Sequence, residues 1–437
     1  MFSSLSFRPG SGKSAAHQKL LFTDLCQACQ DGNLGWARNQ VSEGADVNSI
    51  DAIFNSPLSY AIKRGDLAIV KLLVEEGGAR VGGADGRSSA MVFSAVQSRN
   101  IPILTYLLDK SAPISSVCGD SKDRGSWKTP LALAVETGQL EAVKLLVEHG
   151  ADVNGSEQAN SSPKGLTPLC TAADRHYPAI TELLLQYQAR INASESCADW
   201  GSFLTALHVA SYRGHDDIVD ILLSAGADAA LTCTTTMPSK TTGVTALHIS
   251  TGACATKLLA SPGASIFARD SAGQFPLSGA VMVRSVESVR TLLGKSAPVN
   301  AQNRKGETAL HIACRLFAKE AKRGRPDHLK DYRAIAAELV DGGANPGSKK
   351  AARIIIITEC KKLLAQLKED GEDEEERERR TYKRGLFETM DAVAGLVEKQ
   401  AAERKREAFS SNGATADDGP KEVPRRYVAQ SSLAFGY

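Results

Sequence analysis

One short motif recurs nine times along this chain of 437 residues, and it constrains the fold more than any other feature of the sequence. Five copies share Thr, then Pro or Ala, then Leu, and they start at Thr129, Thr167, Thr205, Thr245 and Thr308. Four looser copies start at Thr23, Ser56, Met91 and Phe275. Successive starts lie 30 to 40 residues apart. Because such periods are typical of stacked supersecondary units, we expect a repeat protein with one continuous core.

Each copy carries the signals for two short helices. The Thr or Ser suits the N-cap, because its hydroxyl accepts a hydrogen bond from a free backbone N–H, and Pro suits the first helical position. About nine residues later comes a turn such as Arg213-Gly214-His215, followed by an amphipathic stretch such as 143–146. A Gly such as Gly150 then closes the second helix, where positive φ is favoured. One such pair cannot bury its own apolar face, so neighbouring pairs must stack.

Three features occur together: a 33-residue basic period, the Thr-Ala-Leu-His motif at 205–208, and the Gly-Ala-Asp-Val-Asn motif at 150–154. In all three the sequence resembles the ankyrin-repeat family, over roughly residues 20–347. The resemblance implies an all-α fold, an ankyrin-repeat solenoid of stacked helix-turn-helix units with hairpin-like fingers between the units. In that family the concave groove and the finger tips bind other proteins. The resemblance therefore implies a protein partner.

Three copies depart from the pattern. The third, at Met91, has lost the motif but keeps an apolar second helix. The seventh lacks about three residues, which we assign to the turn between its helices, and we expect it to be distorted and to bend the stack. The ninth contains an insertion near 316–330, which we expect to form an exposed loop between its two helices.

Four consecutive fingers are longer than the basic period requires. They are rich in Ser, Thr, Asn, Asp and Gly, and they lie at about 115–127, 155–164, 193–203 and 231–242. We expect them to project from one side of the solenoid and to contact a partner. The alternative is simple tolerance, because extending a loop costs little closure entropy.

Two of the three tryptophans of the chain lie in these long fingers. An exposed Trp is a common hot spot of protein interfaces. Packing of the ring on the next helix is the alternative for each of them. The candidate partner-binding residues are Trp127, Lys128, Trp200, Tyr212, Arg213 and His215.

The composition changes after Gly347. Apolar residues at helical spacing, from Ile356 to Leu367, predict a helix that covers the end of the solenoid. Fourteen of the 17 residues at 368–384 are charged, and they favour a linker or a solvated helix over a core. The expected order is a disordered tail (1–19), the solenoid (20–347), a capping helix (348–368), the charged segment (369–384), an amphipathic helix (385–408) and a disordered tail (409–437).

Charge and cysteine usage exclude several classes of function. The formal net charge is only +2, so nothing indicates a nucleic-acid partner. Nine cysteines spread over a long chain indicate reduced thiols in the cytoplasm or the nucleus. No apolar run reaches the roughly 18 residues that a membrane helix needs. The oligomeric state is left open.

We expect no cofactor and no metal. Gly12-Lys13-Ser14 lacks the first Gly of a P-loop, and Cys26 and Cys29 fall within the first predicted helix, where core packing is favoured. The three repeat histidines occupy one equivalent position, for which the resemblance implies bonds to backbone and to the cap Thr; they are His208, His248 and His311.

These observations predict a non-catalytic scaffold or adaptor that holds a protein partner in the groove and fingers of repeats three to seven. The alternative is a nuclear regulatory protein whose solenoid masks a transcription or chromatin factor, with the basic residues at 377–384 directing import. An enzymatic activity in the C-terminal region is disfavoured, because its charged composition offers too little core.

Overall fold

The computed structural model describes residues 15–52, 55–81, 90–115, 128–155, 167–197, 201–235, 240–323 and 325–344. The chain divides into two units, Met1–Gly347 and Ser348–Tyr437, and every described residue belongs to the first. The predicted segments 348–368, 369–384, 385–408 and 409–437 therefore lie outside the described residues, as do the P-loop-like residues 12–14.

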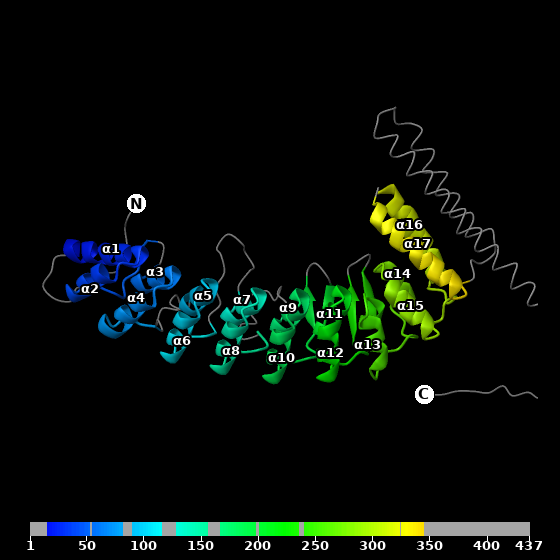
Figure 1. Ribbon diagram of the computed structural model, residues 1–437, viewed down its shortest axis with the longest axis horizontal. Coiled ribbons are helices and arrows are strands. Elements are labelled where there is room, and N and C mark those ends of the chain that lie inside the picture. The colour runs from blue at the N-terminus through cyan, green and yellow to red at the C-terminus, as the bar shows by residue number, and fades with distance from the viewer. Residues whose placement is uncertain are drawn as a thin grey trace, which may run out of the picture. The chain divides into compact units, whose positions relative to one another are not determined.

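The described residues form nine helix pairs, one for each copy of the motif (Figure 1). The first helices are α1 (Ala15–Asp31), α3 (Pro57–Arg64), α5 (Ala90–Gln97), α7 (Pro130–Glu136), α9 (Pro168–Arg175), α11 (Ala206–Arg213), the short 3₁₀ helix η2 (Ala246–His248), α14 (Pro276–Met282) and α16 (Ala309–Lys322). The second helices are α2 (Leu34–Ser42), α4 (Leu67–Lys71) with its π-helical continuation η1 (Leu72–Glu76), α6 (Ile101–Asp109), α8 (Leu140–Glu148), α10 (Pro178–Gln186), α12 (Asp216–Ser224), α13 (Cys254–Ala260), α15 (Val286–Gly294) and α17 (Pro326–Asp341).

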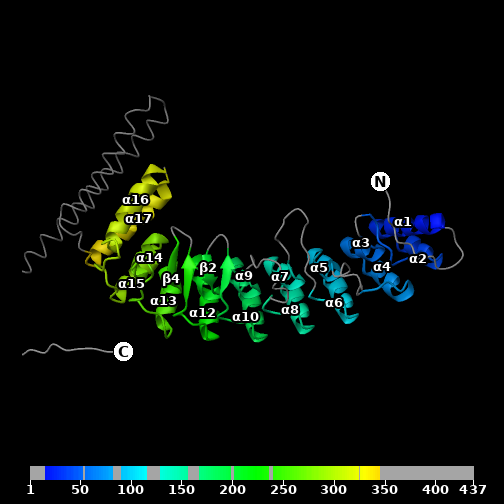
Figure 2. The same cartoon turned by 180° about the vertical axis from the view of Figure 1, so that it is seen from behind.

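The pairs stack into a solenoid. Each first helix packs on the first helix of the next pair, and each second helix packs on the next second helix, without a break from α1 to α17 (Figures 1 and 2). Aliphatic side chains such as Ile69, Leu107 and Leu146 are fully buried between the two rows. The stacking therefore supplies the core that one pair lacks, as the repeat pattern predicts.

The helix caps follow the sequence signals in most copies. The hydroxyls of Ser56, Thr129 and Thr167 each accept a hydrogen bond from a backbone N–H in the first turn of the helix, and Pro follows each of them. The prediction for the first copy is wrong: Thr23 lies inside α1, which begins at Ala15, within the segment predicted as a tail. The Thr23 hydroxyl donates to the carbonyl of Lys19 one turn earlier, so it does not cap.

Asparagines in the segments that follow second helices join successive repeats. In each case the side-chain Oδ1 accepts a hydrogen bond from a backbone N–H one repeat further on. The pairs are Asn48–Arg80, Asn154–Arg190 and Asn192–Asp228, at 2.9, 2.8 and 3.0 Å. These bonds fix the register between neighbouring repeats.

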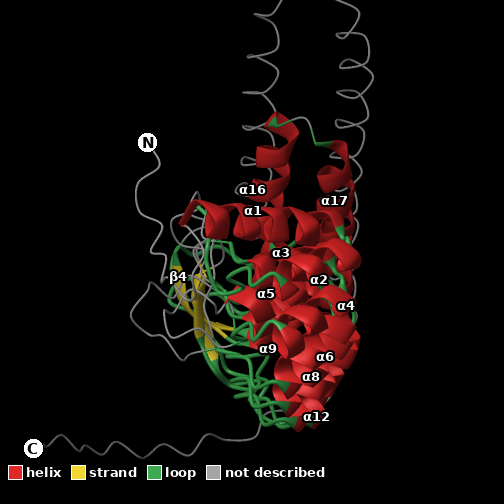
Figure 3. Ribbon diagram, turned by 90° about the vertical axis from the view of Figure 1, so that its left-hand side faces the viewer, coloured by secondary structure: helices red, strands yellow, loops and turns green. Residues whose placement is uncertain are grey.

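Two of the long fingers form a β-sheet beside the helices (Figure 3). The finger predicted at 193–203 supplies β1 (Glu195–Cys197) and β2 (Gly201–Leu204), and the finger at 231–242 supplies β3 (Thr232–Thr235) and β4 (Thr241–Thr245). All pairings are antiparallel, and the order is β1-β2-β3-β4. The hairpin-like fingers expected from the resemblance are thus true hairpins that pair with each other, and we call them the finger sheet.

The seventh repeat is shortened in its first helix, not mainly in the turn. Only η2 is left of that helix, and the Thr251 backbone N–H donates to the carbonyl of Ser211 in α11 at 2.9 Å. On the other side, α14 approaches so closely that a Cβ at Gly279 would overlap the carbonyl oxygen of His248. The missing residues therefore leave a seam where two backbones touch.

The expectation of a loop in the ninth repeat is wrong. The insertion extends both helices, so that α16 has 14 residues and α17 has 16. Only residues 323–325 are left between them. The inserted sequence contains several Ala, Leu, Lys and Arg residues, which are good helix formers, and the added turns pack on each other.

Candidate partner-binding surface

Lys128 and Arg213 take part in ion pairs on the first helices of repeats four to six. The Lys128 Nζ lies 2.6 Å from Oε2 of Glu136, whose other oxygen lies 3.8 Å from Nη2 of Arg175 in the next repeat. One repeat further, Nε of Arg213 donates to Oδ1 of Asp174 at 2.8 Å. These charges are paired within the solenoid, so they are held in place before any partner arrives.

His215 stands where the turn of repeat six meets the turn of repeat five. Its ring stacks on His176 with centroids 4.2 Å apart and planes inclined by 7°. The His176 Nε2 lies 2.9 Å and 3.0 Å from the two oxygens of Asp217. Burial and the adjacent His176 lower the pKa of His215, which favours its neutral form.

Tyr212 is half-buried, and its carbonyl oxygen accepts a hydrogen bond from the Thr251 hydroxyl at 2.9 Å. Trp127 and Trp200 lie outside the described residues. The structure thus places Arg213 and His215 in contacts between repeats, and pairs Lys128 with Glu136 of its own repeat.

The three repeat histidines have the structural role that the resemblance implies. The Nδ1 of His208 accepts from the Thr205 backbone N–H at 3.4 Å and lies 2.8 Å from the Thr205 hydroxyl, while Nε2 faces the carbonyl of Val244 at 3.3 Å. Burial lowers the pKa of His208 to about 4, so the ring is neutral at physiological pH. His248 repeats this arrangement with Thr245 and Gln274.

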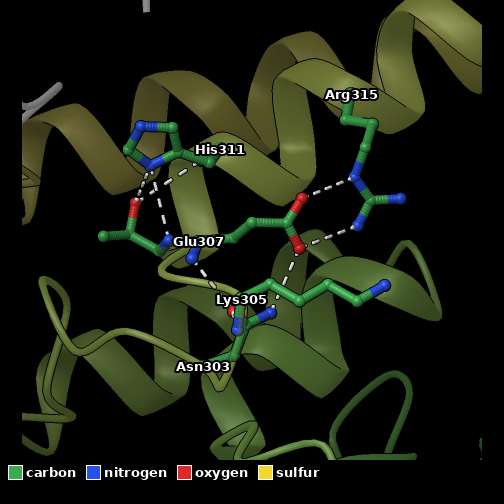
Figure 4. A network of polar contacts seen from close by, with 6 residues as sticks. Asn303, Lys305, Glu307, His311 and Arg315 are labelled. Atoms are coloured by element: carbon green, nitrogen blue, oxygen red, sulfur yellow. Dashed lines mark hydrogen bonds and ion pairs between the residues drawn. The ribbon is translucent and has the colours of Figure 1, made fainter. Parts of the chain in front are cut away.

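The finger before the ninth repeat is compact and closes on a side chain (Figure 4). The Asn303 Oδ1 accepts the backbone N–H groups of Lys305 and Glu307, both at 2.9 Å. The Glu307 carboxylate accepts from Nε of Arg315 at 2.9 Å and from Nδ2 of Asn303 at 3.1 Å. Burial alone would raise the pKa of Glu307, but these hydrogen bonds and the Arg315 charge outweigh it, and the pKa is lowered.

The finger sheet presents an aromatic residue that the sequence reasoning missed. In the pairing of β1 with β2, Glu195 lies opposite Leu204 and Ser196 lies opposite Ser202, which leaves Phe203 as the extra residue of a β-bulge. Its φ is +61°, and 61 % of its surface is exposed. Positive φ is a strained conformation for a bulky residue.

A signal for Phe203 does exist in the repeat alignment. Two residues before the cap position, three later copies have a Gly with φ of +73° or +74°: Gly243, Gly273 and Gly306. In the sixth copy this Gly is replaced by Phe203, and the same position holds Trp127 in the fourth copy and Phe54 in the second. Comparing the copies at this position would have identified the substitution of an aromatic residue for Gly.

Other classes of site are not found in the part of the chain that the structure describes. There, no three His, Cys, Asp or Glu side chains gather in a way that could hold a metal ion. Cys26 and Cys29 are buried thiols in α1, and burial raises the pKa of each to about 12. Among the described helices, none is both long and apolar enough to cross a membrane.

Three family models match parts of the chain, and all three describe ankyrin repeats. The model described as ankyrin repeats in three copies matches residues 25–118 and 114–195. A single ankyrin repeat matches 203–234, and ankyrin repeats in many copies match 280–317.

Known proteins match parts of the chain. It is 28 % identical over 145 residues to the ankyrin repeat and SAM domain-containing protein 6 of Danio rerio. This match covers 33 % of this chain and 19 % of that protein. It is 27 % identical over 151 residues to the ankyrin repeat-containing protein YIL001W of Saccharomyces cerevisiae, 33 % of this chain and 29 % of that protein. The chain thus matches less than a third of the length of either relative.

Solved ankyrin repeat domains align with the structure. That of human ASB11 covers 55 % of this chain and 98 % of its own, with 21 % identity and a TM-score of 0.42. That of Bcl-3 covers 54 % of this chain and 97 % of its own, with 28 % identity and a TM-score of 0.42.

Proposed function

The chain belongs to the ankyrin-repeat family, whose repeats form protein–protein interaction domains, and we propose that it is a non-catalytic adaptor holding one protein partner in the groove and fingers of repeats three to seven. The observation that carries this proposal is the finger sheet. Two consecutive fingers are longer than the repeat needs, and their extra residues pair into four ordered strands.

Simple tolerance of a long loop does not account for that order. A tolerated insertion has no reason to pair with the insertion of the next repeat, whereas Gly201 and Ser202 of one finger pair with Thr235 and Thr234 of the other. Hydrogen-bonded strands hold a surface in one conformation, which lowers the entropy lost when a partner binds. On the first helices, Glu136 and Asp174 hold the charged ends of Lys128 and Arg213 in ion pairs.

The test exchanges the long fingers for compact ones. Residues 193–203 and 231–242 are each replaced by the compact finger that precedes the ninth repeat and contains Asn303 to Glu307. The same replacement at 264–274 is the control. We expect both chains to keep the helical circular dichroism of the wild type. Proteins that co-purify with the wild-type chain and with the control, identified by mass spectrometry, should be lost from the finger variant. Unchanged co-purification would show that the partner does not bind through the finger sheet.

A further inference from the structure

Seven residues other than Gly have positive φ in the described part of the chain. Each of them stands where other repeats have a Gly. Arg99, His176 and Arg284 end first helices, as Gly65, Gly138 and Gly214 do, while Ser111, Gln188 and Ser296 end second helices, as Gly150 and Gly226 do. Phe203 is the seventh, at the Gly position of the fingers, and it is the largest apolar side chain of the set.

The first-helix substitutes use their side chains to join repeats. Arg99 donates to the carbonyl of Thr137 at 3.3 Å, His176 bonds to Asp217, and Arg284 lies 3.0 Å from Asp331. Phe203 makes few contacts that could offset its backbone strain, because 61 % of its surface is exposed. The backbone is therefore strained at an exposed aromatic residue, and such strain is typical of functional sites.

The backbone on either side of Phe203 is held in place. Strands pair with β2 on both sides, and the next residue, Leu204, is 2 % exposed and anchored in the core. After it, Thr205 begins the capping box of α11 with His208. Phe203 is thus presented at a fixed position, as a preorganised contact residue would be.

The surroundings of the ring define what it fits. Strands β2, β3 and β4 contain no charged residue, and their more accessible side chains are Thr232, Thr234, Thr235 and Thr242; the charged residues of the two fingers within the strands or beside them are Glu195 in β1 and the exposed Lys240 just before β4. An aromatic ring gains free energy by leaving water, and hydroxyl groups are readily hydrogen-bonded across an interface. A charged group placed against strands β2, β3 and β4 would lose its hydration without gaining a countercharge from these strands.

From these observations we infer that Phe203 is the anchor residue of the interface, and that it inserts into an uncharged, apolar pocket on the partner protein. This inference rests on the proposed function and adds the chemistry of the partner to it. Anchors of this kind are aromatic, and their truncation typically weakens binding at least tenfold.

The experiment uses the full chain and two substitutions, Phe203→Gly and Phe203→Ala. Gly relieves the strain, so we expect the folding equilibrium constant to rise about threefold and the urea midpoint to rise with it. Ala keeps Cβ and the positive φ, so its midpoint should stay close to that of the wild type. If the ring were needed for folding, both midpoints would fall, and the inference would be wrong.

The partner is identified with a photo-crosslinking side chain, benzoylphenylalanine, in place of Phe203. The matched control carries the same group at Phe267, which is 62 % exposed in a compact finger. We expect an adduct from position 203 that maps to aliphatic or aromatic residues of one protein. The purified protein should bind Phe203→Gly and Phe203→Ala at least about tenfold more weakly than it binds Phe267→Ala.

Three outcomes would overturn the inference: equal labelling from both positions, an adduct on a charged surface or on a second copy of this chain, or full affinity in the Phe203 variants. If exchange of the fingers abolishes co-purification while Phe203→Ala binds normally, the anchor is wrong and the proposed function stands. If neither change affects binding, the proposed function fails as well.

Discussion

Two kinds of finger connect the repeats, and they satisfy their backbone groups differently. The compact fingers at 270–274 and 303–307 close on the side chain of their first residue, Asp270 or Asn303, which accepts two backbone N–H groups of its own turn. The fingers at 193–203 and 231–242 close by strand pairing. A compact finger therefore uses its polar groups internally, whereas the finger sheet frees its side chains for other contacts.

The connection between finger and helix differs less than the fingers themselves. His208 reaches the carbonyl of Val244 in the finger sheet, and His248 reaches that of Gln274 in a compact finger. Both rings are buried, and burial lowers the pKa of both. The helix thus contacts only the last residues of the finger through its histidine, and this contact does not depend on the length of the finger.

Acid should affect this connection most strongly. The pKa of His208 is about 4 in the folded chain and near 6.5 when unfolded, so the unfolded chain takes up the proton first. Its contribution, on the order of 3 kcal/mol, is complete above pH 6.5 and is lost as the pH falls toward 4. Urea unfolding measured from pH 7.5 to 4.5 should show this loss, and His208→Gln should flatten the profile. A wild-type profile that is already flat would contradict the assignment.

The compact fingers should depend on their first side chain. In Asp270→Ala two N–H groups lose their acceptor at a site that is 5 % exposed, so we expect a loss of about 2 kcal/mol in the free energy of unfolding. Asp270→Asn, which copies Asn303, should restore most of it. Thr234→Ala in the finger sheet should change stability by less than about 0.5 kcal/mol. Equal losses of stability in Asp270→Ala and Thr234→Ala would show that the two kinds of finger do not depend differently on their side chains.

The glycine position of the fingers should respond to a single methyl group. Gly306 has φ of +74° and open space around its Cβ position, so Gly306→Ala isolates the backbone cost, about 1 kcal/mol. The measurement is the shift in thermal midpoint, with Gly294→Ala as control, because that Gly also faces open space but has no positive φ. A neutral Gly306→Ala would mean that Phe203 is not strained either.

The ends of the second helices offer the smallest effect, with the opposite sign. Gln188 and Ser296 have φ of +61° where other repeats have Gly. Replacing either by Gly should stabilise the chain by about 0.5 kcal/mol, because the relieved strain exceeds the added freedom of the unfolded state. Differential scanning calorimetry of the variant with both substitutions would measure the sum of the two stabilising effects. Destabilisation would show that these side chains make contacts that matter more than φ.

Local rules predict much of this fold from the sequence. Thr129 and Thr167 begin helices where cap chemistry and the following Pro say they should, and neighbouring pairs stack as their apolar faces require. The failures are places where packing overrides the local signal. Thr23 resembles a cap but lies in a longer helix, and the insertion near 316–330 extends two helices because each can cover the other.

The candidate surface was less predictable for a physical reason. The contacts of Arg213 with Asp174 and of His215 with His176 join residues 39 apart, and they depend on how far one repeat is shifted along the next. No local pattern encodes that shift. Phe203 is different, because its position is fixed by the repeat itself and a comparison with Gly243 exposes it.

The contact between η2 and Gly279 limits how this protein could change by recombination. Side chains between repeats can adjust to a new neighbour, but at this contact main chain lies against main chain, and any Cβ at 279 would collide with it. The seventh and eighth repeats are consequently not interchangeable modules: duplicating, deleting or swapping either one alone would bring a first helix of ordinary length against a surface shaped for three residues. We therefore expect a recombinant to fold well only when it keeps the two repeats together.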